Sequence, residues 1–309
     1  MPAPSRSKFS PPESSPSESS PSESSPSESS GPISSTSAHC DDDLIALAEE
    51  LADVAGEISL NYYRSGVAVD DKPDHSPVTI ADREAEAAVR ALIKARYPEH
   101  GIIGEEHGIE NGQAELVWVI DPIDGTKSFI TGNPLFGNLI ALVRNERPLL
   151  GVINMPVLGE RWVGASGHPT RFTRRDGTRQ ISKGRACGRL DQAILRCTAP
   201  EMFTTAANAA KFGNLSNQAR LRLYGGDCFC YGQLASGFVD LVVEADLQTY
   251  DFMALLPVVL GAGGVASDWN GAPLTLASDG RVVMAMDAAL HAQALTLLRD
   301  EDDGQQPRA

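Results

Sequence analysis

The 309-residue chain has no apolar segment long enough to cross a bilayer. Its longest mostly apolar stretch, residues 253–266, is shorter than the ~20 residues of a spanning helix, and Pro257 and three glycines interrupt it. The N-terminal region lacks the continuous apolar core of a secretory signal, and its glutamates are atypical of a transit peptide. We therefore expect a cytoplasmic protein with no membrane partner.

Cysteine and positive charge are also scarce. The five cysteines show no C-x-x-C or Cys/His spacing typical of a zinc site, and only Cys228 and Cys230 lie close together, so we expect buried free thiols. The 26 Lys and Arg residues face 41 Asp and Glu residues, which gives a net charge of -15. Such a chain repels nucleic acid and anionic membranes, and it needs bridging cations to bind a phosphate.

Composition divides the chain into three parts. Residues 14–30 repeat a Ser-Ser-Pro-Ser-Glu unit without large apolar side chains, which predicts a disordered tail over residues 1–40. Its Ser-Pro steps leave open phosphorylation or recruitment of a partner. One large domain is expected over 41–299, with lobes of roughly 41–190 and 191–299, followed by a polar tail over 300–309.

Hydrophobic spacing predicts helices and strands in mixed order, and therefore a layered α/β body. Thr79 and Asp82 match the start signal of a helix. Pro257 should kink or shorten the last predicted helix. The predicted helices cover residues 41–63, 80–97, 228–235 and 252–260, and the predicted strands cover 117–123, 138–143, 149–154, 221–223, 239–244 and 281–286.

The strongest local signal is Trp118-Val-Ile-Asp-Pro-Ile-Asp-Gly-Thr126, an apolar strand that ends in two carboxylates and a turn. Asp121 and Ile123 should point to one side of the strand, so that a metal could take a carboxylate and a backbone carbonyl together. Asp124 could direct the N–H groups of Gly125 and Thr126 toward an anion, or it could simply cap a helix.

Two further acidic elements are expected near this strand end. One is Gly104-Glu105-Glu106-His107-Gly108, which could equally be a solvated loop, and the other is Asp251, which could equally be a helix cap after a turn at 248–250. Together these carboxylates exceed what capping requires, and histidine is nearly absent from them. A ligand set made of oxygen atoms favours Mg²⁺ over zinc.

These motifs, together with Tyr250-Asp251 and Gly261-Ala-Gly-Gly264, resemble the inositol monophosphatase family of phosphatases over residues 41–299. The resemblance implies a layered α-β-α-β-α sandwich, a site between two lobes, and a homodimer that hydrolyses a small phosphate monoester with Mg²⁺. The spacing of the residues alone predicts only a mixed α/β protein with an acidic metal site.

The resemblance also implies roles for individual residues. Thr126, hydrogen-bonded to Asp82, would orient and help deprotonate the attacking water, with Glu106 in the same network. Asp124, Gly125, Thr126 and Asp251 would contact the substrate. The proposed ligands of one Mg²⁺ are Glu105, Asp121 and the carbonyl of Ile123, and those of a second are Asp121, Asp124 and Asp251.

Residues beside the alcohol part of the substrate are expected to set specificity. Asp227 stands where inositol-specific members have a small residue, and with Glu244 it suits a cationic substrate. Arg222 could shape the pocket or form an unrelated ion pair. Segments 76–82, 129–134 and 226–231 resemble the histidinol-phosphatase branch, which points to histidinol phosphate. Inositol phosphate, sugar bisphosphates and 3'-phosphonucleotides stay open, as does an inactive metal-binding regulator.

Overall fold

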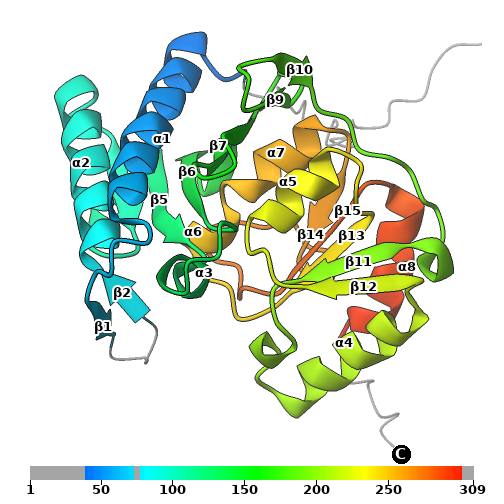
Figure 1. Ribbon diagram of the computed structural model, residues 1–309. Coiled ribbons are helices and arrows are strands. Elements are labelled where there is room, and N and C mark those ends of the chain that lie inside the picture. The colour runs from blue at the N-terminus through cyan, green and yellow to red at the C-terminus, as the bar shows by residue number, and fades with distance from the viewer. Residues whose placement is uncertain (1–38, 73–76, 301–309) are drawn as a thin grey trace, which may run out of the picture. The chain divides into compact units, whose positions relative to one another are not determined.

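Residues 39–72 and 77–300 are described by a computed structural model (Figure 1). The repeats of the predicted N-terminal tail and residues 301–309 lie outside the described residues, so the tail predictions and the domain boundaries stay predictions.

Two N-terminal helices form the first layer. The predicted helices at 41–63 and 80–97 are confirmed as α1 (Asp42–Tyr62) and α2 (Ile80–Arg96). The capping box at the start of α2 is present, because the Thr79 Oγ accepts the Ala81 N–H at 3.1 Å and Asp82 Oδ2 accepts the Thr79 N–H at 2.9 Å. This box fixes Asp82 at the first turn of α2, at its N-terminal end.

An eight-stranded sheet lies against these helices, in the order β10-β9-β8-β7-β6-β5-β3-β4. β3 and β5 are parallel, and the other neighbouring strands are antiparallel. A small ladder of β1 (Val69–Asp71) and β2 (Pro77–Thr79) precedes α2. The sheet consists of β3 (Gly101–Gly104), β4 (Gly108–Glu110), β5 (Leu116–Asp124), β6 (Gly137–Arg144), β7 (Arg147–Met155), β8 (Glu160–Ala165), β9 (Arg171–Thr173) and β10 (Arg179–Ile181).

A second sheet has five strands in the order β12-β11-β13-β15-β14. β11 runs parallel to both β12 and β13, which makes crossover connections necessary, whereas β15 is antiparallel to its neighbours. These strands are β11 (Ile194–Cys197), β12 (Leu221–Tyr224), β13 (Leu241–Glu244), β14 (Val265–Ser267) and β15 (Val282–Ala285).

Alternating side chains place a hydrophobic core on each face of both sheets. Trp118 of β5 packs with α1 and α2, while its neighbour Val119 packs with the central helices; in β13, Val242 faces the centre and Val243 faces the outer helices. The predicted α-β-α-β-α sandwich is confirmed (Figure 1). The central layer holds α5 (Phe229–Ala235), α6 (Thr249–Phe252) and α7 (Leu255–Gly261), and the outer layer holds α4 (Ala206–Gln218) and α8 (Ala288–Leu298).

The predicted single helix over 252–260 is wrong. The helical segment begins earlier, as α6, then breaks at Met253 and Ala254 and restarts as α7. Pro257 is therefore the third residue of α7, where its missing N–H has no partner to lose within the helix.

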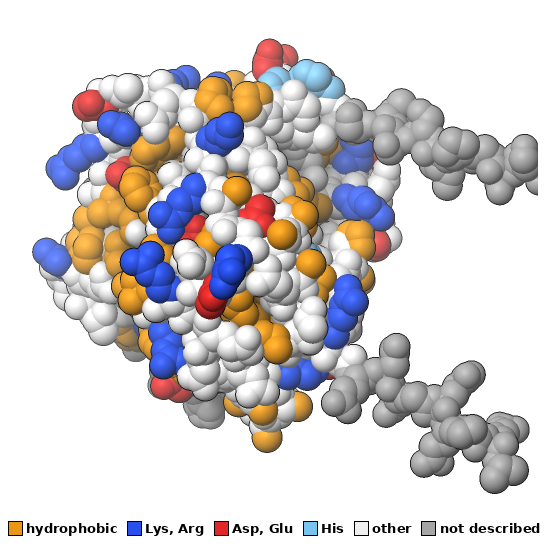
Figure 2. Space-filling view, turned by 90° about the vertical axis from the view of Figure 1, so that its right-hand side faces the viewer, with side chains coloured by type: hydrophobic (Ala, Val, Ile, Leu, Met, Phe, Trp, Pro, Cys, Tyr) orange, Lys and Arg blue, Asp and Glu red, His pale blue; other side chains and the backbone are white. Residues whose placement is uncertain are grey.

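Most acidic residues lie at the surface, but five of those in the described part of the chain are buried. On the face shown in Figure 2, Lys and Arg side chains are scattered among hydrophobic atoms, although the net charge of the chain is -15. None of the described helices is long and apolar enough to cross a bilayer. The buried carboxylates among the described residues are Asp82, Glu86, Asp121, Asp240 and Glu244.

Candidate active site

A bulge at the end of β5 brings two aspartates to the same side. Asp121 pairs with Leu139 of β6 and Asp124 with Gly137, so three residue steps on β5 oppose two on β6. In a regular strand, residues three apart point to opposite faces, and a bulge redirects the side chain that follows it. The carboxylate of Asp121 also accepts the Ile123 N–H at 3.0 Å, which holds the bulged segment.

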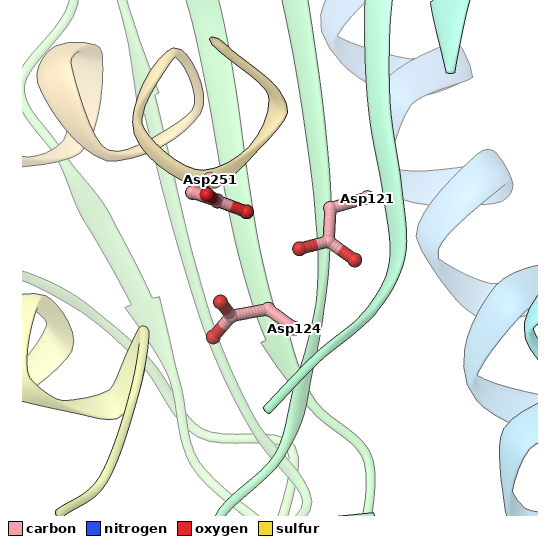
Figure 3. A group of neighbouring side chains, drawn as sticks. All are labelled: Asp121, Asp124 and Asp251. Atoms are coloured by element: carbon pink, nitrogen blue, oxygen red, sulfur yellow. The ribbon is translucent and has the colours of Figure 1, made fainter. Parts of the chain in front are cut away.

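Asp251 completes an acidic cluster from the opposite side of the cleft. It is the third residue of α6, and its Oδ2 accepts the Gln248 N–H at 2.7 Å, so it closes a capping box rather than occupying the cap position. One carboxylate oxygen from each of Asp121, Asp124 and Asp251 lies within 4.8 Å of the other two. Figure 3 shows the three carboxylates converging. The structure thus brings together three of the predicted metal ligands.

Burial and like charge raise the pKa values of these carboxyl groups. Burial raises the pKa of Asp121 well above its usual range, and the charges of Glu105, Asp124 and Asp251 add to this effect. Burial and the charge of Asp227 raise the pKa of Asp124, although a hydrogen bond from the Cys228 N–H at 2.6 Å opposes the rise. Burial raises the pKa of Asp251 to about 7. The ionised cluster is therefore unstable without a compensating cation.

Glu105 and Glu106 lie in the turn between β3 and β4, beside the aspartates. The Glu105 N–H donates to the Ile120 carbonyl at 3.2 Å, which ties the turn to β5 one residue before Asp121. The ammonium group of Lys72 lies 2.7 Å from Glu105 Oε1 and 2.6 Å from Glu106 Oε1. Sequence analysis missed Lys72, because its place in a polar loop gave no periodic or motif signal.

The predicted hydrogen bond between Thr126 and Asp82 is not present. Thr126 donates its hydroxyl to the Ile123 carbonyl at 3.1 Å, whereas Asp82 Oδ2 accepts the hydroxyl of Thr79 at 2.6 Å. The local turn offers Thr126 a nearer acceptor, three residues back, and the capping box holds one oxygen of Asp82. The other oxygen, Asp82 Oδ1, is buried and has no hydrogen-bond partner within the described residues, and the charge of Glu105 is among the causes that raise the pKa of Asp82, after its burial.

A cavity of about 390 Å³ lies against the acidic cluster and contains the two predicted specificity residues. Asp227, at a positive φ of 44°, accepts a hydrogen bond from the Ser128 hydroxyl at 3.1 Å. Glu244 is buried at the end of β13, where it accepts the Thr198 N–H and the Tyr231 hydroxyl, both at 2.7 Å. Both carboxylates thus have oxygens fixed by the protein and lone pairs left for a ligand.

Gly125 allows Asp227 to approach the end of β5. It caps the short helix α3 (Thr126–Ile130) with a φ of 84°, and a Cβ added there would lie 2.8 Å from Asp227 Oδ2. Gly125, Thr126 and Asp124 all line the cavity, but the anion contacts predicted for their N–H groups stay a prediction. The cap of α3 is Gly125, so the alternative of Asp124 as a helix cap is excluded.

Arg222 lies away from these groups. It is exposed on β12, donates to Asn217 Oδ1 at 2.6 Å and does not line the cavity. We therefore leave Arg222 out of the substrate pocket proposed below.

A larger cavity of about 500 Å³ between α1 and β8 also contains acidic residues. There, Glu49 pairs with Arg171 at 3.1 Å and Asp53 pairs with Arg161 at 2.6 Å. Within residues 39–72 and 77–300, no lysine or arginine forms an ion pair with Asp121, Asp124 or Asp251. The uncompensated carboxylates and their oxygen donors fit a divalent cation, whereas the larger cavity needs none.

Comparison with known proteins decides the family of this site. The family model described as "Inositol monophosphatase family" matches residues 41–302. The chain belongs to the inositol monophosphatase family. Members are metal-dependent phosphatases, so this chain has the fold of a phosphoric monoester hydrolase and a cluster of acidic residues that can bind a metal.

Three members of the family are similar to this chain over most of its length. The bifunctional phosphatase IMPL2, chloroplastic, of Arabidopsis thaliana is 45% identical over 83% of this chain and 75% of its own length. A histidinol-phosphatase of Mycobacterium tuberculosis is 34% identical over 84% of this chain and 98% of its own. The solved structure of an inositol monophosphatase from Zymomonas mobilis is 46% identical, covers 83% of this chain and 98% of its own, and has a TM-score of 0.75. Identity alone does not separate the substrates that these names indicate.

Proposed function

We propose that the chain is a Mg²⁺-dependent phosphatase that converts histidinol phosphate to histidinol and phosphate in histidine biosynthesis. The observation that carries this proposal is the pair of carboxylates, Asp227 and Glu244, that lines the same cavity as Asp124 and Asp251. A histidinol group carries an ammonium and an imidazole, and both can donate to fixed carboxylates. Neutral inositol offers only hydroxyl groups.

Asp121, Asp124, Asp251, Glu105 and the carbonyl of Ile123 would hold the metal. Uncatalysed hydrolysis of a phosphate monoester is so slow that rate enhancements reach ~10²¹, whereas one general base contributes only about 10²–10⁴. Bound Mg²⁺ would supply the remaining charge stabilisation by neutralising phosphate oxygens and lowering the pKa of water. The buried, like-charged carboxylates favour such a cation, because it removes their mutual repulsion.

Thr126 and Asp82 would position the attacking water. The unpartnered Asp82 Oδ1 is available to accept a proton or a hydrogen bond, and rotation of the Thr126 hydroxyl away from the Ile123 carbonyl would allow it to take part. Glu106 would join this network, since the charges of Asp82 and Glu86 are among the causes that raise its pKa, after its burial. These assignments follow the family resemblance and the acceptor that the fold leaves free.

Two carboxylates suit a cation for electrostatic reasons as well. Burial raises the pKa of Glu244 despite the hydrogen bonds from the Thr198 N–H and the Tyr231 hydroxyl, and burial raises the pKa of Asp227 despite the Ser128 hydrogen bond. A cationic group between the two carboxylates offsets the free-energy cost of ionising them in a buried place, whereas a neutral polyol does not. This difference is what the structure offers toward discriminating histidinol phosphate from inositol phosphate.

The test is phosphate release from histidinol phosphate, inositol 1-phosphate, fructose 1,6-bisphosphate and 3'-phosphoadenosine 5'-phosphate, each with Mg²⁺ and with EDTA. We expect kcat/KM to be highest for histidinol phosphate and to disappear in EDTA. Preference for inositol 1-phosphate would support phosphate ester hydrolysis but overturn the proposed role of Asp227. Hydrolysis of inositol 1-phosphate is the second candidate function, supported by the 46% identity to the Zymomonas mobilis protein. No release from any ester would indicate a metal-binding regulator.

A further inference from the structure

The turn that carries Glu105, one of the proposed metal ligands, is also held by a side chain of α2. Glu86 lies one helical turn after Asp82 on α2, and its side chain is fully buried. Its Oε2 accepts the Glu106 N–H at 2.6 Å, and its Oε1 accepts the His107 N–H at 3.1 Å. Glu86 therefore contacts the backbone of the turn that carries Glu105 and Glu106.

Arg90 extends this contact along the turn. Its Nε donates to Glu86 Oε1 at 2.7 Å, and its guanidinium also donates to the Gly108 carbonyl. A Cβ added at Gly104 would collide with the Glu86 carboxylate and lie 2.8 Å from Arg90 Nη2. The turn between Gly104 and Gly108 is thus fitted closely around an ion pair supplied by one face of α2.

A buried ion pair of this kind is not explained by stability alone. Desolvating both charges costs as much as their attraction returns, and well-packed apolar residues serve stability equally well. A carboxylate, however, is an acceptor with both oxygens, so it can take two adjacent N–H groups in a fixed direction. The two hydrogen bonds to Glu86 tie the turn to α2, and the hydrogen bond from the Glu105 N–H to the Ile120 carbonyl ties it to β5, one residue before Asp121.

We propose that Glu86 is a positioning residue: by holding the backbone of the Glu105–Glu106 turn, it sets the distance between Glu105 and Asp121 and so the affinity of the metal site. Glu86 does not line the cavity beside the acidic cluster and is not among the proposed metal ligands, so it would act through the turn. The inference rests on the proposed metal-dependent function, because it concerns the affinity of that same site.

The test is the Mg²⁺ dissociation constant of substrate-free Glu86→Gln, measured by titration calorimetry. The amide side chain has one oxygen, and its NH₂ would face a backbone N–H, so at least one of the two hydrogen bonds is lost. We expect Mg²⁺ binding to weaken about tenfold, or about 1.4 kcal/mol, while kcat at saturating Mg²⁺ stays within about twofold of wild type. Weaker Mg²⁺ binding with a nearly unchanged kcat distinguishes a positioning role from a general loss of folded protein, which would lower kcat as well.

Asp240→Asn is the matched control. Asp240 is also fully buried, pairs with Arg185 and accepts the Ile194 N–H at 2.8 Å, but it belongs to the five-stranded sheet. We expect it to lower the thermal midpoint as Glu86→Gln does, without changing Mg²⁺ affinity. An equal change in Mg²⁺ affinity in both variants would overturn the proposal, since the effect would then be one of general destabilisation.

Further results separate this proposal from the function on which it rests. If wild type binds Mg²⁺ and folded Glu86→Gln binds it equally well, Glu86 is not a positioning residue. If wild type binds no Mg²⁺, the proposed function fails and the inference fails with it. Should Glu86→Gln not fold, Glu86→Asp keeps the charge but withdraws the carboxylate by one methylene, and unchanged Mg²⁺ affinity in that variant would overturn the proposal.

Discussion

The ammonium group of Lys72 lies 2.7 Å from the carboxylate of Glu105, which is one of the proposed metal ligands, and compensates its negative charge. Lys72 also reaches Glu106 at 2.6 Å. Burial lowers the pKa of Lys72, but the hydrogen bonds that its ammonium group donates to both glutamates outweigh this effect, so the lysine stays charged. The chain thus carries a cation of its own at one edge of the acidic cluster.

We expect Lys72→Met to bind Mg²⁺ about tenfold more tightly, because the competing ammonium is removed from Glu105. Titration calorimetry on the substrate-free protein measures this change. Lys94→Met is the control, since Lys94 forms an exposed ion pair with Glu110 at 2.7 Å. Equal or weaker Mg²⁺ binding by Lys72→Met would show that Lys72 assists the metal rather than competing with it.

Asp121→Asn should separate stability from catalysis. The change keeps the volume of the side chain but removes a buried charge, so the metal-free protein should melt at a higher temperature than wild type. Turnover at saturating Mg²⁺ should fall by about 10²–10³-fold, because one carboxylate oxygen and the negative charge of a proposed metal ligand are lost. Melting in EDTA and kcat in Mg²⁺ measure the two effects, and near-normal turnover would contradict the role of Asp121.

The stability of the metal-free protein should depend on pH in a defined direction. Burial raises the pKa of Asp251 from 3.8 to about 7, so the folded protein binds more protons than the unfolded chain between those values. The stability that protonation of Asp251 contributes is therefore fully present below pH ~4 and is lost as pH rises through ~7. Thermal melts in EDTA at pH 5 and pH 8 test this, and Asp251→Asn should flatten the dependence.

Mg²⁺ should reverse that trend. The cation binds the ionised carboxylates, so the thermal midpoint gained on adding Mg²⁺ should be larger at pH 8 than at pH 5. An equal gain at both pH values would indicate that the ion binds away from Asp121, Asp124 and Asp251. This comparison needs no substrate and is independent of the reaction that the enzyme catalyses.

Asp227→Asn should change substrate preference without abolishing the chemistry. The change removes a charge that faces the alcohol part of the substrate, and we expect kcat/KM for histidinol phosphate to fall about 10–100-fold, while cleavage of a generic phosphate ester changes little. Ser128→Ala is a control that removes only the hydroxyl bonded to Asp227 at 3.1 Å. A parallel loss for all esters would place Asp227 in the metal site instead.

Local signals in the sequence predicted most of the elements. The helices of residues 41–63 and 80–97 and the strands of β5, β6 and β7 follow from apolar spacing, and Thr79 with Asp82 marked the start of α2. The break between α6 and α7 was not visible, because a run of apolar residues favours a continuous helix and the turn at 248–250 hides α6.

The candidate site shows the same division. The sequence identified Asp121, Asp124, Glu105 and Asp251 as carboxylates at the ends of elements, and the family resemblance supplied their roles. Lys72 and Glu86 were missed as partners of the site, since a lysine in a loop and a glutamate in a helix are ordinary surface residues by composition. Only the packing of α2 against the turn makes Glu86 buried and gives its carboxylate two N–H partners.

What the sequence determined by itself is the set of available ligands and the class of fold: composition, charge and motif spacing specify oxygen ligands and a mixed α/β body, and the resemblance of its motifs indicates the family. What only the tertiary structure decided is which of those oxygens meet. Asp121 and Asp124 are three residues apart and would face opposite sides of a regular strand, and the bulge in β5 is what turns them toward Asp251. The bulge depends on the pairing of β5 with β6, which no local periodicity specifies.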